Sequence, residues 1–167
     1  MKLSFVGFKP TFMRREIFLV TIFIFCLFQA TLLDYFKIFG VKPDILLISL
    51  VLASLSFDLK WVFIFSLLCG VLKDSFSANI FGLYTLIFSL WGIFIVKLSK
   101  KITLDADYLY VALIAIIVII NSIIMRLASV FLGYPVVSLG IFLRTSLIEA
   151  IYTALISPLL FKYLRWG

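Results

Sequence analysis

Apolar residues gather in six continuous stretches, and charged or turn-forming residues mark the breaks between them. The stretches cover residues 17–33, 45–57, 61–72, 80–96, 108–132 and 138–161. Hydrophobic residues do not alternate with polar ones as they do in a barrel strand, so the pattern predicts helices. The second and third stretches are short, because a bilayer core of about 30 Å takes about 20 helical residues. Either they extend into flanking polar residues or they form a hairpin that does not fully cross.

The composition supports a membrane location. Hydrophobic residues make up 65% of the chain and charged residues 14%, and the mean hydropathy is +1.26. A soluble domain of 167 residues could not bury so much apolar surface in one core. We therefore expect a single integral membrane domain over residues 1–167, with an all-α fold of six transmembrane helices.

The basic residues predict the orientation of these spans. The formal net charge is +7, but Lys and Arg lie in short clusters at the ends of apolar stretches, so no nucleic-acid partner is expected. Arg126 and Arg144 fall inside spans. With six spans, the side that holds both termini carries ten basic residues against three, which predicts cytoplasmic termini. The ten are Lys2, Lys9, Arg14, Arg15, Lys60, Lys97, Lys100, Lys101, Lys162 and Arg165, and the three are Lys37, Lys42 and Lys73.

The residue types present argue against an enzyme or a channel. The chain has no His, which removes the commonest general base and metal ligand. Ser66, Ser89 and Ser122 therefore lack a His partner, and Cys26 and Cys69 follow no metal or redox spacing. No span has the continuous polar lining that permeation requires. We expect no catalytic residues, no cofactor and no metal.

Several short motifs lie between the first and fourth stretches, and each taken alone is only a helix start or end. Pro43 occupies a predicted first helical position, and Asp44 lies near the positive end of the same helix. Together, the order and spacing of these motifs over residues 29–92 resemble the MreD family of rod-shape-determining membrane proteins. The motif residues in this chain are Gln29, Pro43, Asp44, Gly70, Asp74 and Gly82.

This resemblance implies a non-enzymatic subunit of the bacterial cell-elongation machinery, a multi-pass protein of the cytoplasmic membrane. The implied partner is MreC, with RodA and its transpeptidase as further partners in the same bilayer and MreB as an indirect one. The implied role is to maintain cell shape and to organise lateral peptidoglycan synthesis. The implied fold is similar to the six-helix substrate-binding components of energy-coupling-factor vitamin transporters.

A stripe of small residues follows the fourth stretch, independently of the resemblance. Gly82, Thr85, Ser89 and Gly92 recur at spacings of three, four and three, so they share one helix face. In lipid, small residues let two helix backbones approach closely. The stripe predicts a helix-packing face, either inside the bundle or against a helix of a partner.

The last two stretches carry the intramembrane charges. Folding them about a turn near Pro135 sets Arg126 level with Arg144 and Asn121 level with Glu149. Buried charges are usually paired, so we expect Glu149 to neutralise one Arg and Asp74 the other. On this pairing, a Glu149→Gln change should reduce the amount of folded protein. The polar layer either fixes the helix register or forms a pocket for a partner or small ligand.

A second function fits the same length and span count. The chain could be the substrate-binding component of an energy-coupling-factor vitamin transporter, which would also use polar groups in the outer half of the bundle. One feature counts against this alternative: the first stretch has only Ala30 near its end and lacks the Ala-x-x-x-Ala motif that those components use to pack on their coupling partner.

Overall fold

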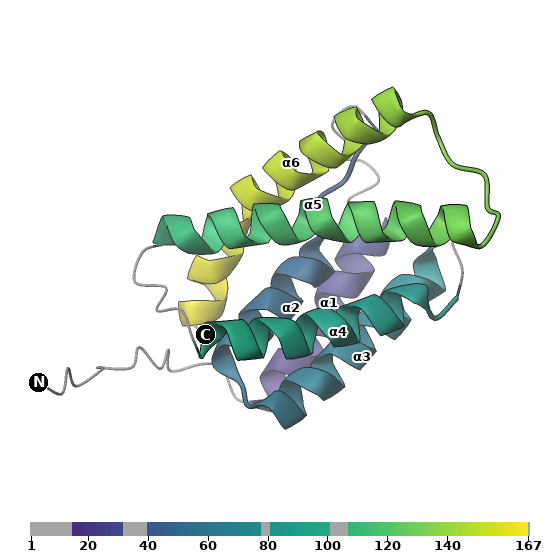
Figure 1. Cartoon of the computed structure of the whole chain (residues 1–167). Helices are drawn as coiled ribbons and strands as arrows, with labels where there is room; N and C mark the ends of the chain where they lie inside the picture. The colour runs from purple at the N-terminus through teal and green to yellow at the C-terminus, as the bar shows by residue number, and fades with distance from the viewer. Residues whose placement is uncertain (1–14, 32–39, 78–80, 101–106, 167) are drawn as a thin grey trace, which may run out of the picture.

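The computed structural model describes residues 15–31, 40–77, 81–100 and 107–166 (Figure 1). These residues form six helices, which confirms the predicted all-α architecture for the described part of the chain. The helices are α1 (Arg15–Thr31), α2 (Ile45–Ser56), α3 (Leu59–Phe76), α4 (Leu83–Ser99), α5 (Asp107–Phe131) and α6 (Leu139–Trp166).

Helix α2 is the centre of the bundle. It packs against α1, α3, α4, α5 and α6, and every residue from Ile45 to Ser54 is buried. A helix that is apolar all round must be covered on all sides, and here other helices cover it. Its 12 residues are about 18 Å long. This helix is therefore as short as the sequence predicts, because a bilayer core measures about 30 Å.

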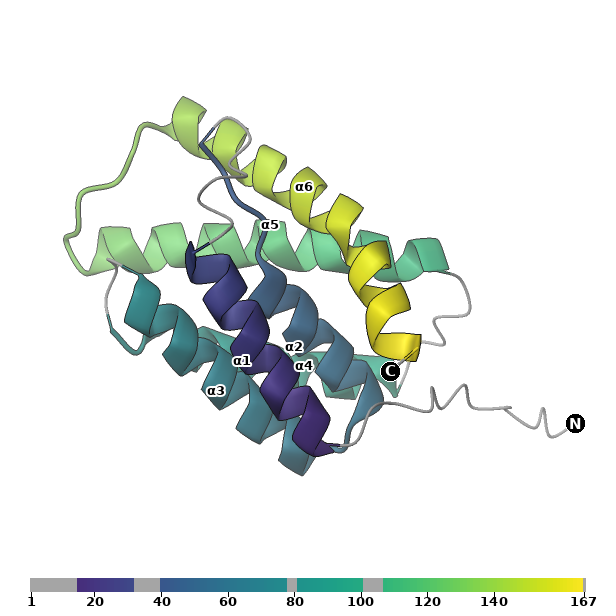
Figure 2. The same cartoon turned by 180° about the vertical axis from the view of Figure 1, so that it is seen from behind.

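The other helices surround α2 as two hairpins and the single helix α1. Helices α3 and α4 lie side by side, and α5 and α6 form the second hairpin, as the two opposite views show (Figure 2). At the C-terminal end of α2, the rings of Phe18, Phe57 and Phe65 contact one another, with centroids 5.0 to 5.2 Å apart. This aromatic cluster joins α1, the end of α2 and α3.

Helix α3 is longer than its predicted range. It covers residues 59–76 rather than 61–72, because the helix continues through Lys73 and Asp74. Both charges find partners inside the bundle, so neither has to mark a helix end. Helix α4 runs from Leu83 to Ser99 rather than over residues 80–96, and residue 80, the predicted start, lies outside the described part of the chain.

Two helical stretches in the described ranges are long and apolar enough to cross a membrane, Leu109–Phe131 and Leu139–Leu160. Both leave much of their apolar surface unburied. On α6, for example, Leu147, Ile151 and Leu155 recur every four residues and are all more than half exposed. A soluble monomer rarely exposes such a continuous apolar face, so this face suits lipid or a partner helix. Shorter apolar helical stretches are Glu16–Gln29, Ile45–Ser56 and Leu83–Ser99.

Helix α6 contains Pro158, and its last turns, drawn in yellow, run in a different direction from its first turns (Figure 1). Proline has no N–H to donate, which leaves the Ala154 carbonyl without its usual helical partner. The Ser157 hydroxyl donates a hydrogen bond to that carbonyl at 2.8 Å. Thr153, five residues before Pro158, is fully buried and reaches the start of α2.

Candidate functional site

The start of α2 lies inside the bundle, and Asp44 caps it. The Asp44 carboxylate accepts a hydrogen bond from the Leu47 N–H at 3.2 Å, and the residue is only 2% exposed. Asp44 is therefore the N-cap, and Pro43 precedes it, so the prediction of Pro43 at the first helical position is wrong. The cap requires non-helical backbone at Asp44, which moves the first helical residue to Ile45.

Gln29 supports this cap from α1. Its Oε1 accepts a hydrogen bond from the Leu46 N–H at 3.0 Å, and its Nε2 lies 3.5 Å from Asp44 Oδ1 as a donor. Two of the backbone donors that a helix start leaves unsatisfied thus gain side-chain acceptors, one from Asp44 and one from Gln29. The family-motif residues of the first two helices therefore meet at one point.

Lys73 reaches the same point from α3. Its ammonium forms an ion pair with Asp44 Oδ2 and lies over the rings of Tyr84 and Phe88, 4.5 Å and 5.1 Å from their centroids. An aromatic face attracts a cation, so the two rings of α4 stabilise the buried ammonium. The sequence alone places Lys73 among the flanking charges of the outer side, whereas the structure places it within α3 with its side chain 14% exposed.

Thr153 joins the last helix to this group. Its hydroxyl accepts a hydrogen bond from the Asp44 N–H at 3.1 Å, and both residues are buried. Sequence reasoning missed both Lys73 and Thr153. The signal for Lys73 was present, because adjacent helical residues point about 100° apart and Lys73 and Asp74 can therefore serve different neighbours. Thr153 has no comparable signal in the sequence.

Asp74 caps α4 from outside that helix. One carboxylate oxygen accepts a hydrogen bond from the Tyr84 N–H at 3.1 Å, and the other accepts from the Thr85 N–H at 3.0 Å and the Thr85 hydroxyl at 2.6 Å. The N-cap residue of α4 is Gly82, at φ +92°, which has no side chain for this task. The predicted pairing of Asp74 with an arginine is wrong, because its carboxylate is used by the start of α4.

Of the predicted stripe of small residues, Thr85 and Gly92 face α3, whereas Gly82 is the N-cap of α4 and a Cβ added to it would meet no atom within 4 Å. A Cβ added to Gly70 would lie 2.4 Å from the Thr85 Cα, so the two backbones touch at this point. Further along, a Cβ on Gly92 would lie 3.1 Å from the Ser66 Cβ. Ser89 lies between them, half-buried, and its hydroxyl donates to the Thr85 carbonyl at 2.7 Å. In the structure, Thr85 and Gly92 are thus packed inside the bundle.

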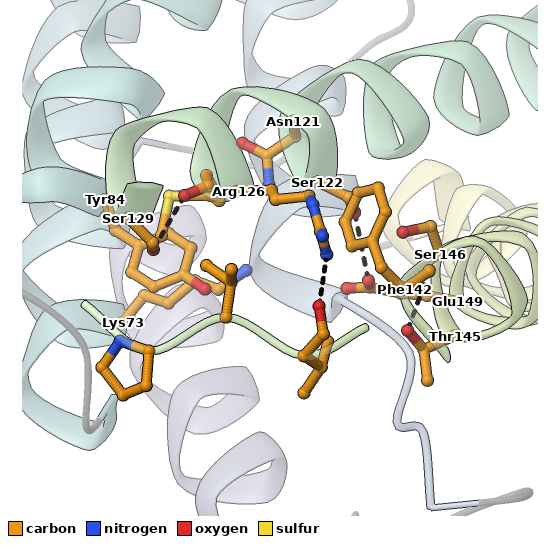
Figure 3. A pocket seen from close by; sticks show the side chains of 14 residues that line it. Lys73, Tyr84, Asn121, Ser122, Arg126, Ser129, Phe142, Thr145, Ser146 and Glu149 are labelled. Carbon is orange, nitrogen blue, oxygen red and sulfur yellow. Dashed lines mark hydrogen bonds between the residues drawn. The ribbon is translucent and has the colours of Figure 1, made fainter. Parts of the chain in front are cut away.

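A cavity of about 300 Å³ lies beside this polar cluster, between α5, α6 and the connection at residues 135–137 (Figure 3). It holds most of the polar layer that the sequence predicts. Arg126 donates from Nη1 to the Val137 carbonyl at 3.0 Å and lies over the Phe142 ring, 4.6 Å from its centroid. Asn121 is 5% exposed, and Glu149 accepts from the Ser122 hydroxyl at 3.3 Å. Arg144 is exposed and does not line the cavity.

The contact between Ser122 and Glu149 agrees to within one residue with the predicted register of the last two helices. The predicted partner of Glu149 is wrong. Within the described residues, Glu149 forms no ion pair with Arg126 or Arg144, because the guanidinium of Arg126 is held by the Val137 carbonyl and the Phe142 ring instead. Lys73 lines the same cavity as Glu149, but its ion pair is with Asp44.

Comparison with known proteins identifies the group to which these residues belong. The family model described as rod shape-determining protein MreD matches residues 11–166, nearly the whole chain. The chain belongs to the MreD family. No curated protein and no solved structure matches it. The MreD match confirms the resemblance drawn from the short motifs, and the likeness to energy-coupling-factor components stays a prediction.

MreD proteins are structural membrane proteins named for rod-shape determination, and no enzymatic activity is attached to the family. In this MreD chain, the motif residues form two linked groups. Gln29 and Asp44 form the cluster at the start of α2 with Pro43 buried beside them, whereas Gly70 and Asp74 hold the start of α4 against α3. Lys73 and Asp74, adjacent on α3, connect the two groups.

Proposed function

We propose that the chain is a non-enzymatic subunit of the bacterial cell-elongation machinery that binds an MreC-like partner and helps to organise lateral peptidoglycan synthesis. The family match over residues 11–166 carries this proposal, because it covers the whole bundle rather than one motif. RodA with its transpeptidase would share the complex, and MreB would act on it indirectly. These partners follow from the family resemblance.

The use of polar groups in the bundle supports a scaffold rather than a reactive site. Asp44 and Asp74, the two best-buried carboxylates, both accept backbone hydrogen bonds at helix starts. Such contacts fix helix positions, and they leave the carboxylates no role as a general base. Apolar side chains on the outer faces of α5 and α6 suit lipid or a transmembrane helix of a partner.

We also propose six membrane crossings with both termini in the cytoplasm, supported by ten basic residues against three. The short helix α2 would cross together with the non-helical residues 41–44 that precede it. Non-helical backbone is tolerated at membrane depth where protein buries it, and Pro43 and Asp44 are buried. Reporter fusions after residues 100 and 135 should be cytoplasmic and external respectively. The reverse pattern would contradict this topology.

The partner proposal is tested by co-purification and depletion. A tagged chain should retain an MreC-like protein with one span in mild detergent, and depletion of the chain should turn rod-shaped cells round. Complementation with a Lys60→Gln variant should restore the rods, because Lys60 is exposed and remote from the polar cluster. Failure to capture such a protein, together with unchanged cell shape on depletion, would contradict the proposal.

The cavity between α5 and α6 supports a second candidate function. A vitamin-binding component of an energy-coupling-factor transporter would need such a polar hollow, and its about 300 Å³ could hold a small molecule. Retention of a vitamin through purification, together with co-purification of a transporter ATPase, would favour this alternative. The family match favours the elongation subunit.

A further inference from the structure

The cavity contains two opposite charges that do not meet. Arg126 and Glu149 both line it, yet they form no ion pair with each other. Arg126 is held at the Val137 carbonyl and over the Phe142 ring, and Glu149 is held at the Ser122 hydroxyl (Figure 3). The structure therefore keeps a cation and an anion apart in one open pocket.

The third charge of the cavity does not compensate for this separation. Lys73 lines the same space, but its ammonium forms an ion pair with Asp44 and none with Glu149. One positive and one negative group thus remain for the interior of the cavity. In a membrane such groups are costly without partners of opposite charge, and they mark functional sites by default. A ligand that carries both charges would satisfy them together.

Asn121 adds an unsatisfied acceptor to the same lining. It is 5% exposed, and its Oδ1 has no hydrogen-bond partner. A buried acceptor without a partner costs the free energy of its lost hydration, so native structures rarely leave one empty. Asn121 precedes Ser122, the residue that holds Glu149. The buried lining thus holds an acceptor without a partner beside the Glu149 carboxylate, whose one hydrogen bond comes from Ser122.

We infer that the cavity binds a zwitterionic group, with an anionic phosphate or carboxylate at Arg126 and an ammonium that carries N–H donors at Glu149. The guanidinium has five N–H donors, and only one hydrogen bond of Arg126 goes to the protein within the described residues. A primary ammonium has three donors, which can serve the Glu149 carboxylate. The headgroup of phosphatidylethanolamine and a free zwitterion such as phosphoethanolamine share this chemistry.

The first test uses the unchanged full chain and a series of lipid headgroups. Native mass spectrometry of the purified protein would compare phosphatidylethanolamine with phosphatidylcholine, which keeps both charges but has no N–H donor. Phosphatidylglycerol keeps the phosphate but has no ammonium, so its retention would show how much the ammonium contributes to binding. We expect phosphatidylethanolamine to be retained about tenfold more than either, the effect of losing hydrogen bonds to a charged group. Equal retention of all three lipids would contradict a lipid occupant.

Variants locate the preference within the molecule. Glu149→Gln should abolish the preference for phosphatidylethanolamine over phosphatidylglycerol, because the amide no longer attracts an ammonium. Asp58→Asn is the matched control, since Asp58 is exposed, lies between α2 and α3 and makes no side-chain cap. A preference that survives Glu149→Gln unchanged would place the lipid elsewhere and overturn the inference.

Free phosphoethanolamine distinguishes the two sources. If it displaces bound phosphatidylethanolamine or raises the melting temperature of lipid-depleted protein, and Glu149→Gln removes the effect, the ligand is a soluble zwitterion. If only the lipid binds with this dependence on Glu149, the occupant is the headgroup. If neither molecule binds in a way that depends on Glu149, the cavity is not a zwitterion site.

Discussion

Asp44 and Glu149 are both carboxylates inside the bundle, but their surroundings differ. Asp44 accepts from the Leu47 N–H, lies within reach of Gln29 and forms an ion pair with Lys73. Glu149 accepts one hydrogen bond, from the Ser122 hydroxyl, and has a cavity on its other side. The difference separates a carboxylate that holds helices together from one that is available to a ligand.

The two carboxylates also lie in regions that are packed differently. Around Asp44, helices α1 to α4 meet closely, and Gly70 lets the backbones of α3 and α4 touch. Around Glu149, α5 and α6 form a hairpin with a hollow between them, and a Cβ added to Gly140 would meet no atom within 4 Å. Variants in the first region should therefore cost stability, and variants in the second should cost less.

Lys73→Met should have the largest effect. The change leaves the Asp44 carboxylate buried without its cation, and loss of one partner of a buried ion pair costs about 3–5 kcal/mol. Thermal unfolding of the purified protein in detergent, followed by tryptophan fluorescence, would measure the loss. Unchanged melting would mean that the ion pair contributes nothing to the fold.

The double variant Asp44→Asn with Lys73→Met sharpens this test. Asn keeps a side-chain oxygen that can accept from the Leu47 N–H, so the cap of α2 is retained while both charges are removed. We expect the double variant to melt above the single Lys73→Met variant, because no unpaired charge remains at the start of α2. A double variant less stable than the single one would show that Lys73 acts through packing rather than through its charge.

Much of the fold follows from the sequence alone. The six apolar stretches predict the six helices, because an unbroken apolar run in lipid has to satisfy its own backbone. The boundary of α3 does not follow, since Lys73 and Asp74 look like residues outside a span. They continue the helix because Asp44 lies 29 residues earlier in the chain, and the start of α4 lies about ten residues later. Tertiary contacts, rather than local pattern, decide where this helix ends.

The partners of the charges were harder to predict than their positions. The antiparallel register of α5 and α6 follows from their lengths and the turn near Pro135, and it brings Ser122 to Glu149. Charge counting then suggests an arginine partner for Glu149. The structure instead gives Arg126 a backbone carbonyl and an aromatic ring, both from the connection and the first turn of α6. A count of charged residues does not include the backbone carbonyl groups of a turn, although these can accept hydrogen bonds from an arginine.

Gly70→Ala should have the next largest effect. The new Cβ would lie 2.4 Å from the Thr85 Cα, which is backbone and cannot move aside alone, so α3 and α4 must separate. Such overpacking typically costs about 1–3 kcal/mol. Gly140→Ala is the matched control, because its Cβ would meet no atom within 4 Å. The same melting temperature for both variants would contradict the close approach of α3 and α4.

Glu149→Gln should have the smallest effect on stability when it is measured in lipid-depleted detergent. A glutamine amide oxygen can still accept the Ser122 hydrogen bond, and no cation loses an ion-pair partner, so we expect a change below about 1 kcal/mol. This revises the expectation drawn from the sequence, which assumed an arginine partner and therefore a loss of folded protein. A loss as large as that of Lys73→Met would mean that Glu149 neutralises a cation in the folded protein. In that case Glu149 would resemble Asp44 in holding the fold together. A cationic group of a ligand would then not be needed to neutralise it.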